Sequence, residues 1–113
     1  MPESRHAAVP TVFIENDRVR VTEWRFAPGA ATGWHTHKLD YVVTPMLDGE
    51  LHLELPGGEV AEAELKAGIP YYRAAGVEHD VVNANDYEFV FVETELKQRS
   101  TIAVNLSAAQ NSL

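Results

Sequence analysis

Two histidines, His35 and His37, lie one residue apart in the segment WHTHK. Side chains alternate across a β-strand, so in an extended segment both imidazoles project from one face, ~6.6 Å apart along the strand. From that spacing the two rings can lean onto one cation. Taken alone, the pair is more typical of two solvated surface histidines, and a metal site needs a further ligand from elsewhere in the chain.

The remaining histidines, His6, His52 and His79, are the candidates for a third imidazole ligand. His6 lies near the N-terminus, in a segment expected to be loose. His52 lies on the polar face of its strand, opposite three leucines, where a surface position is expected. His79 shares a strand face with Val77 and Val81 and can therefore face the inside of a barrel. It is the best-placed candidate, and the alternative is a core histidine bonded to a backbone carbonyl.

The segments around these histidines resemble the two sequence motifs of the cupin family. The matching positions are Gly29, His35, His37 and Gly49 for the first motif, and Gly68, Gly76, His79 and Asn83 for the second, with Ala74 in place of its proline. The glutamate of the first motif has no counterpart. Its position falls on Tyr41 or on Val42, depending on whether three or four residues separate it from His37.

The cupin resemblance implies an all-β fold, a double-stranded β-helix or jelly-roll barrel, that is commonly a homodimer. It also implies that His35, His37 and His79 lie inside the barrel and bind a divalent transition metal. We expect Fe, with Ni, Zn, Mn and Cu as alternatives that three histidines also suit. The phrase HTHKLDYVVTP is more loosely similar to small cupins associated with β-alanine degradation.

The absent glutamate affects the chemistry that is expected. Three neutral imidazoles leave a divalent ion with its full formal charge and with open positions for hydroxide or a chelating anionic substrate. This arrangement resembles the three-histidine non-haem iron dioxygenases that act on thiols, diketones or hydroxylated aromatic acids. Zinc with an activated water is the competing chemistry. The alternative to an enzyme is a small-molecule-binding or sensor cupin, and a third possibility is a structural jelly roll without metal.

Other residues near the motifs are candidates for roles beside the metal. Tyr41 is a candidate catalytic phenol near the ion. Trp34 and Arg73 are candidate substrate-binding residues, since an arginine can hold a carboxylate through two hydrogen bonds. For Arg73 a surface or dimer-contact role is an alternative.

The elements that must position these residues are expected to be short β-strands. Apolar and polar residues alternate in residues 17–26, 50–55, 59–65, 78–85 and 87–96, and more briefly in 101–106. In the first of these, Val19 and Val21 share one face, which is the expected buried face. Residues 56–58 form a turn that makes a hairpin, the motif glycines are expected at positive φ, and Pro45 suggests a bulge or an edge. No long amphipathic helix is expected, so the pattern favours a β-sandwich or barrel.

The composition restricts the partners and the compartment. The sequence has 113 residues, no cysteine and a formal net charge of −8. The charge argues against nucleic acid and anionic membranes as partners, and no stretch approaches the ~18 apolar residues of a membrane span. We expect one domain over 1–113, with loose arms at 1–10 and 107–113, in a cytoplasmic protein that binds a small molecule. Homodimerisation through a sheet face or the segment TVFIEND is also expected.

Overall fold

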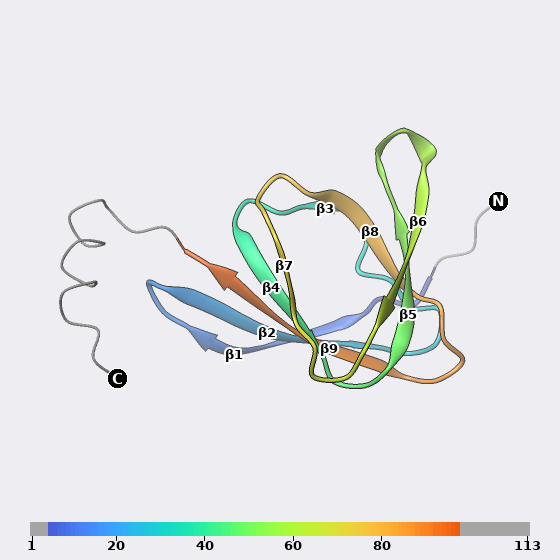
Figure 1. Cartoon of the computed structure of the whole chain (residues 1–113), viewed down its shortest axis with the longest axis horizontal. Helices are drawn as coiled ribbons and strands as arrows, with labels where there is room; N and C mark the ends of the chain where they lie inside the picture. Colours follow the sequence, from blue (N-terminus) through green and yellow to red (C-terminus); the bar gives the residue numbers. More distant parts are fainter. Residues whose placement is uncertain (1–4, 98–113) are drawn as a thin grey trace.

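The chain folds into two antiparallel β-sheets that form a barrel (Figure 1). The computed structural model describes residues 5–97. One sheet has the order β1 (Val9–Glu15), β2 (Val19–Phe26), β9 (Phe89–Leu96), β4 (Asp40–Pro45), β7 (Tyr71–Arg73), and the other β3 (His35–Thr36), β8 (Glu78–Asn83), β5 (Gly49–Glu54), β6 (Val60–Leu65). The prediction of an all-β double-stranded β-helix, or jelly roll, is confirmed.

The core fills one end of this barrel. Phe26, Phe89 and Leu51 are the largest fully buried apolar side chains, and the rings of Phe26 and Phe91 lie 5.4 Å apart. Burying a side chain of this size contributes about 1.5–3 kcal/mol. Asn83 closes the same end, because its buried amide donates hydrogen bonds to the carbonyls of three loop and strand residues, Phe26, Ala27 and Tyr87. The buried side chains and the hydrogen bonds of Asn83 thus hold the strands together at this end.

The predicted hairpin over residues 50–65 is present as β5 and β6, joined by the short 3-10 helix η1 (Pro56–Gly58). Leu51 and Leu53 face inward as expected, whereas Glu50 is exposed. Gly49 departs from the expectation of a positive φ. A Cβ atom there would lie 2.7 Å from the ring of Phe89, so this glycine is needed for the close approach of the backbone to the core.

The face of β2 that points into the barrel is not the one that its apolar residues suggested. The alternation holds, but Arg20, Thr22 and Trp24 line the interior. Val19 and Val21 lie on the opposite face, half-buried. Polar side chains face inward because this part of the barrel is a cavity rather than a packed core.

The N-terminal segment from residue 5 to residue 10 is part of the fold, which corrects the prediction of a loose arm there. Ala8 is buried, and its N–H donates to the carbonyl of Ala31 at 2.9 Å. Arg5 forms ion pairs with Asp80 and Glu54 on the other sheet. The predicted strand at 101–106 and the arm at 107–113 lie outside the described residues.

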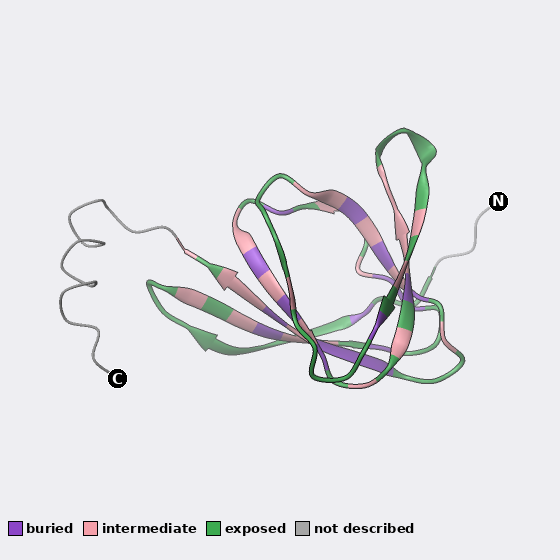
Figure 2. Ribbon diagram, viewed as in Figure 1, coloured by how far each residue is buried: buried purple, intermediate pink, exposed green. Residues whose placement is uncertain are grey.

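Strand β1 is the outer strand of the five-stranded sheet, and all of its residues are exposed (Figure 2). Its pairing with β2 shifts between Val12 and Ile14, which marks a β-bulge at Phe13. The bulge or edge that Pro45 suggested is absent, because β4 pairs with β9 in continuous register up to Pro45 and lies inside the sheet. In residues 5–97, no helix has the length and the apolar character needed to cross a membrane.

Candidate metal centre

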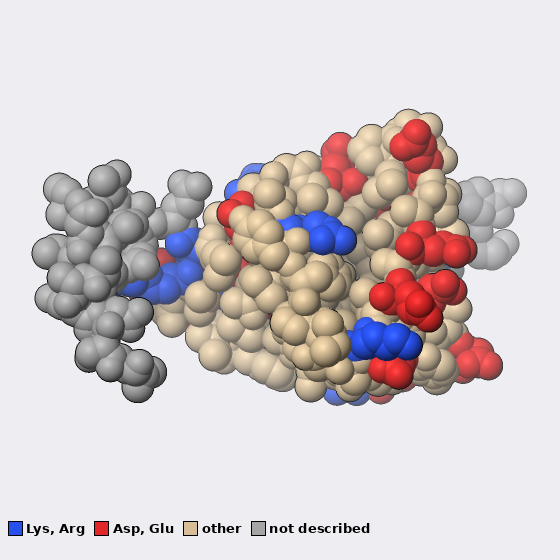
Figure 3. Space-filling view, in the orientation of Figure 1, with Lys and Arg blue, Asp and Glu red and all other residues tan. Residues whose placement is uncertain are grey.

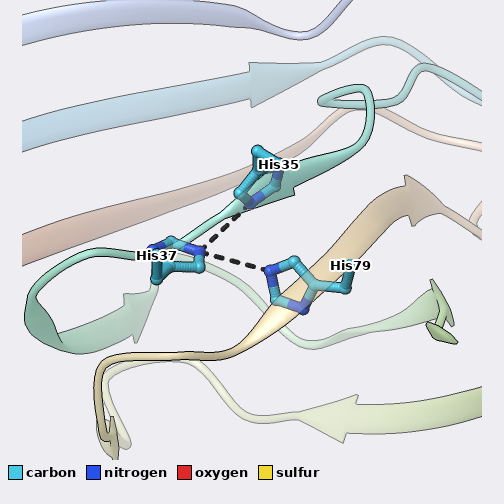
Figure 4. A group of neighbouring side chains, drawn as sticks. All are labelled: His35, His37 and His79. Carbon is cyan, nitrogen blue, oxygen red and sulfur yellow. Dashed lines mark hydrogen bonds between the residues drawn. The ribbon is translucent and has the colours of Figure 1, made fainter.

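Three imidazoles converge at the open part of the barrel (Figure 4). His35 on β3 pairs directly across the sheet with His79 on β8. His37 follows β3, and two backbone hydrogen bonds of 2.8 Å hold it, one to the carbonyl of Val77 and one from the N–H of Gly76. Gly76 has a φ of 103°, a conformation that favours glycine. The three imidazoles therefore depend on the backbone around both sequence motifs.

The distances between the imidazole nitrogens fit a single ion. The Nε2 atom of His37 lies 3.1 Å from that of His35 and 3.2 Å from that of His79. Two nitrogens bound ~2.1 Å from a metal and at right angles to each other lie about 3.0 Å apart. The described residues contain no other cluster of this kind, and the three ligand atoms lie within 4.8 Å of one another. The donor set thus fits a transition metal that accepts imidazole ligands.

The second nitrogen of His35 fixes the state of its ring. Its Nδ1 lies 2.8 Å from the carbonyl oxygen of Gly33, an acceptor, so Nδ1 carries the proton and donates it. Nε2 is then left with a lone pair that faces the other two imidazoles. A hydrogen bond of this type, from the outer nitrogen of a histidine to a carbonyl, is the usual support for a metal ligand.

The electrostatics of the cluster favour neutral imidazoles. Burial, together with the neighbouring His35, lowers the pKa of His37 and of His79 to about 4. Both side chains are almost inaccessible to solvent, with exposed fractions of 7% and 8%. Both rings are therefore neutral at neutral pH, which is the state that binds metal.

Tyr41 occupies the position of the absent motif glutamate. The side chains of β4 alternate, and Tyr41 is buried inside the barrel whereas Val42 lies on the opposite face. The Tyr41 ring stacks on that of His37, with centroids 3.8 Å apart and planes inclined by 17°. Burial raises the pKa of Tyr41 above its usual value, so the side chain is a neutral phenol. Its contact with His37 supports the orientation of that ring.

A buried carboxylate beside the cluster, Glu93, was missed by sequence reasoning. Its Oε2 atom lies 3.8 Å from Nε2 of His37, and its other oxygen accepts a hydrogen bond of 3.3 Å from the indole N–H of Trp24. Burial raises the pKa of Glu93 to about 7, and the nearby Glu95 adds to this effect. The signal in the sequence was a carboxylate on the same strand face as Phe89 and Phe91.

The imidazoles lie on the wall of a cavity of about 470 Å³. Its lining is largely apolar, from residues such as Leu53, Val81 and Phe91, and Tyr71 and Arg73 also line it. Arg73 is exposed, with its guanidinium 4.7 Å from the centre of the Tyr71 ring. The position of Arg73 is therefore compatible with contact between its charge and a molecule in the cavity.

Three other residues considered from the sequence lie apart from this cavity. Trp34 is 51% exposed, and its indole N–H donates to Glu78 on the outside of the barrel. Its position gives no support to the expectation that it binds substrate. His6 is exposed, and His52 lies on the outer face of β5. Neither belongs to the imidazole cluster.

Comparisons with known proteins agree with this architecture. Residues 22–95 match the family described as Cupin domain. The beta-alanine degradation protein BauB of Pseudomonas aeruginosa is 60% identical over 93 residues, 82% of this chain and 97% of that protein. A crystal structure of a cupin domain from Bordetella pertussis Tohama I is 55% identical with a TM-score of 0.82, and the match covers 86% of this chain and 100% of that one. The cupin domain of an XRE family transcriptional regulator from Enterobacter cloacae is similar in fold alone, with a TM-score of 0.64 at 20% identity, covering 83% and 100%.

Proposed function

The chain belongs to the cupin family, and from this we propose that it is a metal-dependent oxidoreductase of the dioxygenase type. His35, His37 and His79 hold a divalent transition metal, Fe first, with Ni, Zn, Mn or Cu as alternatives. The observation that carries the proposal is the convergence of three imidazoles, with Nε2 separations of 3.1 and 3.2 Å, on the wall of a cavity large enough for a small molecule.

The side chains around the cluster have distinct roles in this proposal. The metal, when bound, supplies Lewis-acid and redox chemistry for the reaction of a chelating substrate with oxygen. The apolar walls exclude water and strengthen electrostatic interactions inside the cavity. Arg73 binds an anionic group of the substrate at the mouth, and Tyr41 holds the ring of His37 in place.

The cavity and the likeness to BauB support a proposal for the substrate class. The name of that protein places it in β-alanine degradation, and we propose a role in the same process for this chain. β-Alanine and the products of its deamination are small carboxylates. A cavity of about 470 Å³ that has an arginine in its lining suits a compound of this kind.

The second candidate is a cupin that binds the same small molecule without turnover. It is favoured by the absence of the motif glutamate, because Tyr41 stands in its position and stacks on His37. The discriminating observation is binding of a carboxylate without consumption of oxygen.

We also propose a cytoplasmic homodimer whose partner is a small molecule, not nucleic acid or a membrane. Acidic side chains gather on the side of the molecule where β5 and β6 lie (Figure 3), and Glu59 and Glu62 are among the exposed ones. This distribution, with the net charge of −8, supports the proposal because it repels polyanions.

The test uses full-length protein without a histidine tag. Elemental analysis of the parent should find a transition metal, and alanine substitution of His35, His37 or His79 should remove it while the circular dichroism spectrum stays that of a β-protein. His52→Ala is the matched control and should retain the metal. Metal retained by all three ligand variants would show that the site is elsewhere.

The reaction itself is tested with an oxygen electrode. The metal-loaded parent should consume oxygen in the presence of a member of a panel of small carboxylates, and His79→Ala should not. Carboxylate binding measured by calorimetry without any oxygen uptake would favour the binding cupin over the enzyme.

A further inference from the structure

Glu93 is a buried carboxylate whose charge has little compensation from the protein. It is 8% exposed, and among the described residues its carboxylate accepts one hydrogen bond, from the indole N–H of Trp24. Within residues 5–97, the only basic group within 4.0 Å of its carboxylate is the imidazole of His37. Burying a carboxylate is costly unless it is paired with a cation or binds a metal. A positive charge beside Glu93 would therefore stabilise its ionised form.

The orientation of the carboxylate indicates where that charge belongs. Trp24 holds Oε1 at 3.3 Å, and Oε2 lies 3.8 Å from Nε2 of His37. Two ligands bound ~2.1 Å from one ion lie at most about 4.2 Å apart. The 3.8 Å separation from His37 is within this limit. The Glu93 carboxylate nevertheless lies outside the group of three imidazoles whose ligand atoms are all within 4.8 Å of one another, so it has to move toward the ion to bind it. A hydrogen bond to the other oxygen is a common support for a carboxylate that binds metal.

The motif position on β4 does not supply an anion to the cluster. Tyr41 lies flat against His37 with a plane angle of 17°, and it is a neutral phenol. Glu93 lies on the adjacent strand β9, opposite Val43, which shares the inward face of β4 with Tyr41. Two adjacent strands thus place the stacking tyrosine and the carboxylate beside the same imidazole.

We propose that Glu93 is an anionic ligand of the metal, supplied by β9 in place of the glutamate that the first motif lacks. This inference rests on the proposed function, because it requires that the three histidines bind a metal. The three side-chain torsions of glutamate let Oε2 advance on the ion while the backbone of β9 stays in place. The centre then has three neutral ligands and one anion, so that with a divalent ion its net formal charge is +1.

The test compares Glu93→Gln with Glu88→Gln in the full-length chain. Glu88 directly precedes β9, is exposed, and forms an ion pair with Arg25 at 2.8 Å, apart from the residues that line the cavity. Affinity for Co²⁺ is measured by competition with a chelator at fixed neutral pH, together with the visible absorption spectrum of bound Co²⁺. We expect Glu93→Gln to weaken binding about tenfold or more and to change the spectrum, and Glu88→Gln to do neither.

A second measurement does not depend on the folding of a variant. The infrared difference spectrum of the parent, with and without Co²⁺, should show the change of a carboxyl stretching band as Glu93 binds. Affinity within threefold of the parent for a folded Glu93→Gln, or a difference spectrum without such a band, would overturn the inference. If the parent binds no Co²⁺ at all, the proposed metal site fails. If the parent and Glu93→Gln bind Co²⁺ equally well and the histidine variants do not bind it, the three-histidine site stands without Glu93.

Discussion

The protonation states of a few buried side chains decide what this centre can bind. His37 and His79 are held neutral because burial penalises their charged forms, and the pKa of each is lowered to about 4. Glu93 is affected in the opposite direction, with a pKa raised to about 7, also because of burial. Protons therefore compete with a metal for His37 and His79 only at lower pH than the ordinary histidine pKa of about 6.5 would suggest. For these two imidazoles alone, acid loss of the metal is expected at a correspondingly lower pH, whereas the raised pKa of Glu93 makes protons compete for its carboxylate already near neutrality.

These pKa values predict how the stability of the metal-free protein depends on pH. Between about pH 4.5 and 6.5 the unfolded chain takes up protons on His37 and His79 that the folded chain does not. In the same range the folded chain keeps a proton on Glu93 that the unfolded chain releases. The unfolded state therefore holds about one proton more, and the free energy of unfolding should fall by about 1.4 kcal/mol for each unit of decreasing pH.

Glu93→Gln should make the free energy of unfolding depend more steeply on pH. It removes the carboxyl group whose retained proton in the folded state opposes the effect of the two histidines. Urea unfolding of chelator-treated protein across the range measures both slopes. Equal slopes for the parent and Glu93→Gln would contradict the assignment of a raised pKa to Glu93. His52→Ala, changed on the outer face, serves as the control.

At the scale of elements, strand alternation and register decide which side chains meet inside the barrel. The inward residues of β4 are Tyr41 and Val43, those of β9 include Phe91 and Glu93, and the two strands are neighbours. A shift of one residue in either strand would turn each of these side chains to the outside. A glutamate introduced at one or the other of two successive positions of β4 therefore tests this register directly.

Placing a glutamate at the motif position should compensate for the loss of Glu93. In a Glu93→Gln background, Tyr41→Glu should recover part of the lost Co²⁺ affinity, because residue 41 faces His37. Val42→Glu, on the outer face of the same strand, should recover none. Chelator competition measures both double variants. Recovery by Val42→Glu alone would show that the register of β4 is wrong.

At the scale of the whole molecule, the barrel carries an exposed apolar strand at one side. The strands β1, β2 and β9 extend away from the barrel to the left in Figure 1, and β1 is the outer strand of their sheet. Val9, Val12, Phe13 and Ile14 on β1 are between 48% and 58% exposed. An edge strand with this much apolar surface is a template for pairing with another chain. We therefore retain the expectation of a homodimer as a prediction.

Charges on β1 should separate the expected dimer. The double substitution Phe13→Asp and Ile14→Asp should convert it to a monomer, because the charges would have to be buried in the interface. Val60→Asp on β6, where the side chain is 53% exposed, is the matched control and should leave the dimer intact. Light scattering gives the mass of each. A parent that is monomeric at high concentration would remove the prediction.

The sequence by itself determined the fold class and the histidine cluster. Period-two alternation predicted β5, β6, β8 and β9, because a strand with one buried face needs an apolar residue at every second position. The resemblance of the two histidine segments to the cupin motifs implied that the imidazoles of His35, His37 and His79 meet, and they do.

Only the tertiary structure decided which strands are neighbours and which faces enclose the cavity. In the folded chain Glu93 lies beside His37, and Tyr41 rather than Val42 faces the cluster. Arg20 and Trp24 line the cavity, whereas Val19 and Val21 lie on the opposite face of β2. These results come from the pairing of β9 with both β2 and β4, contacts between segments far apart in the chain. The alternation of apolar and polar residues in one strand indicates only that its two faces differ. Whether the inner face meets a packed core or a cavity depends on the strands around it, and that information is absent from the strand's own sequence.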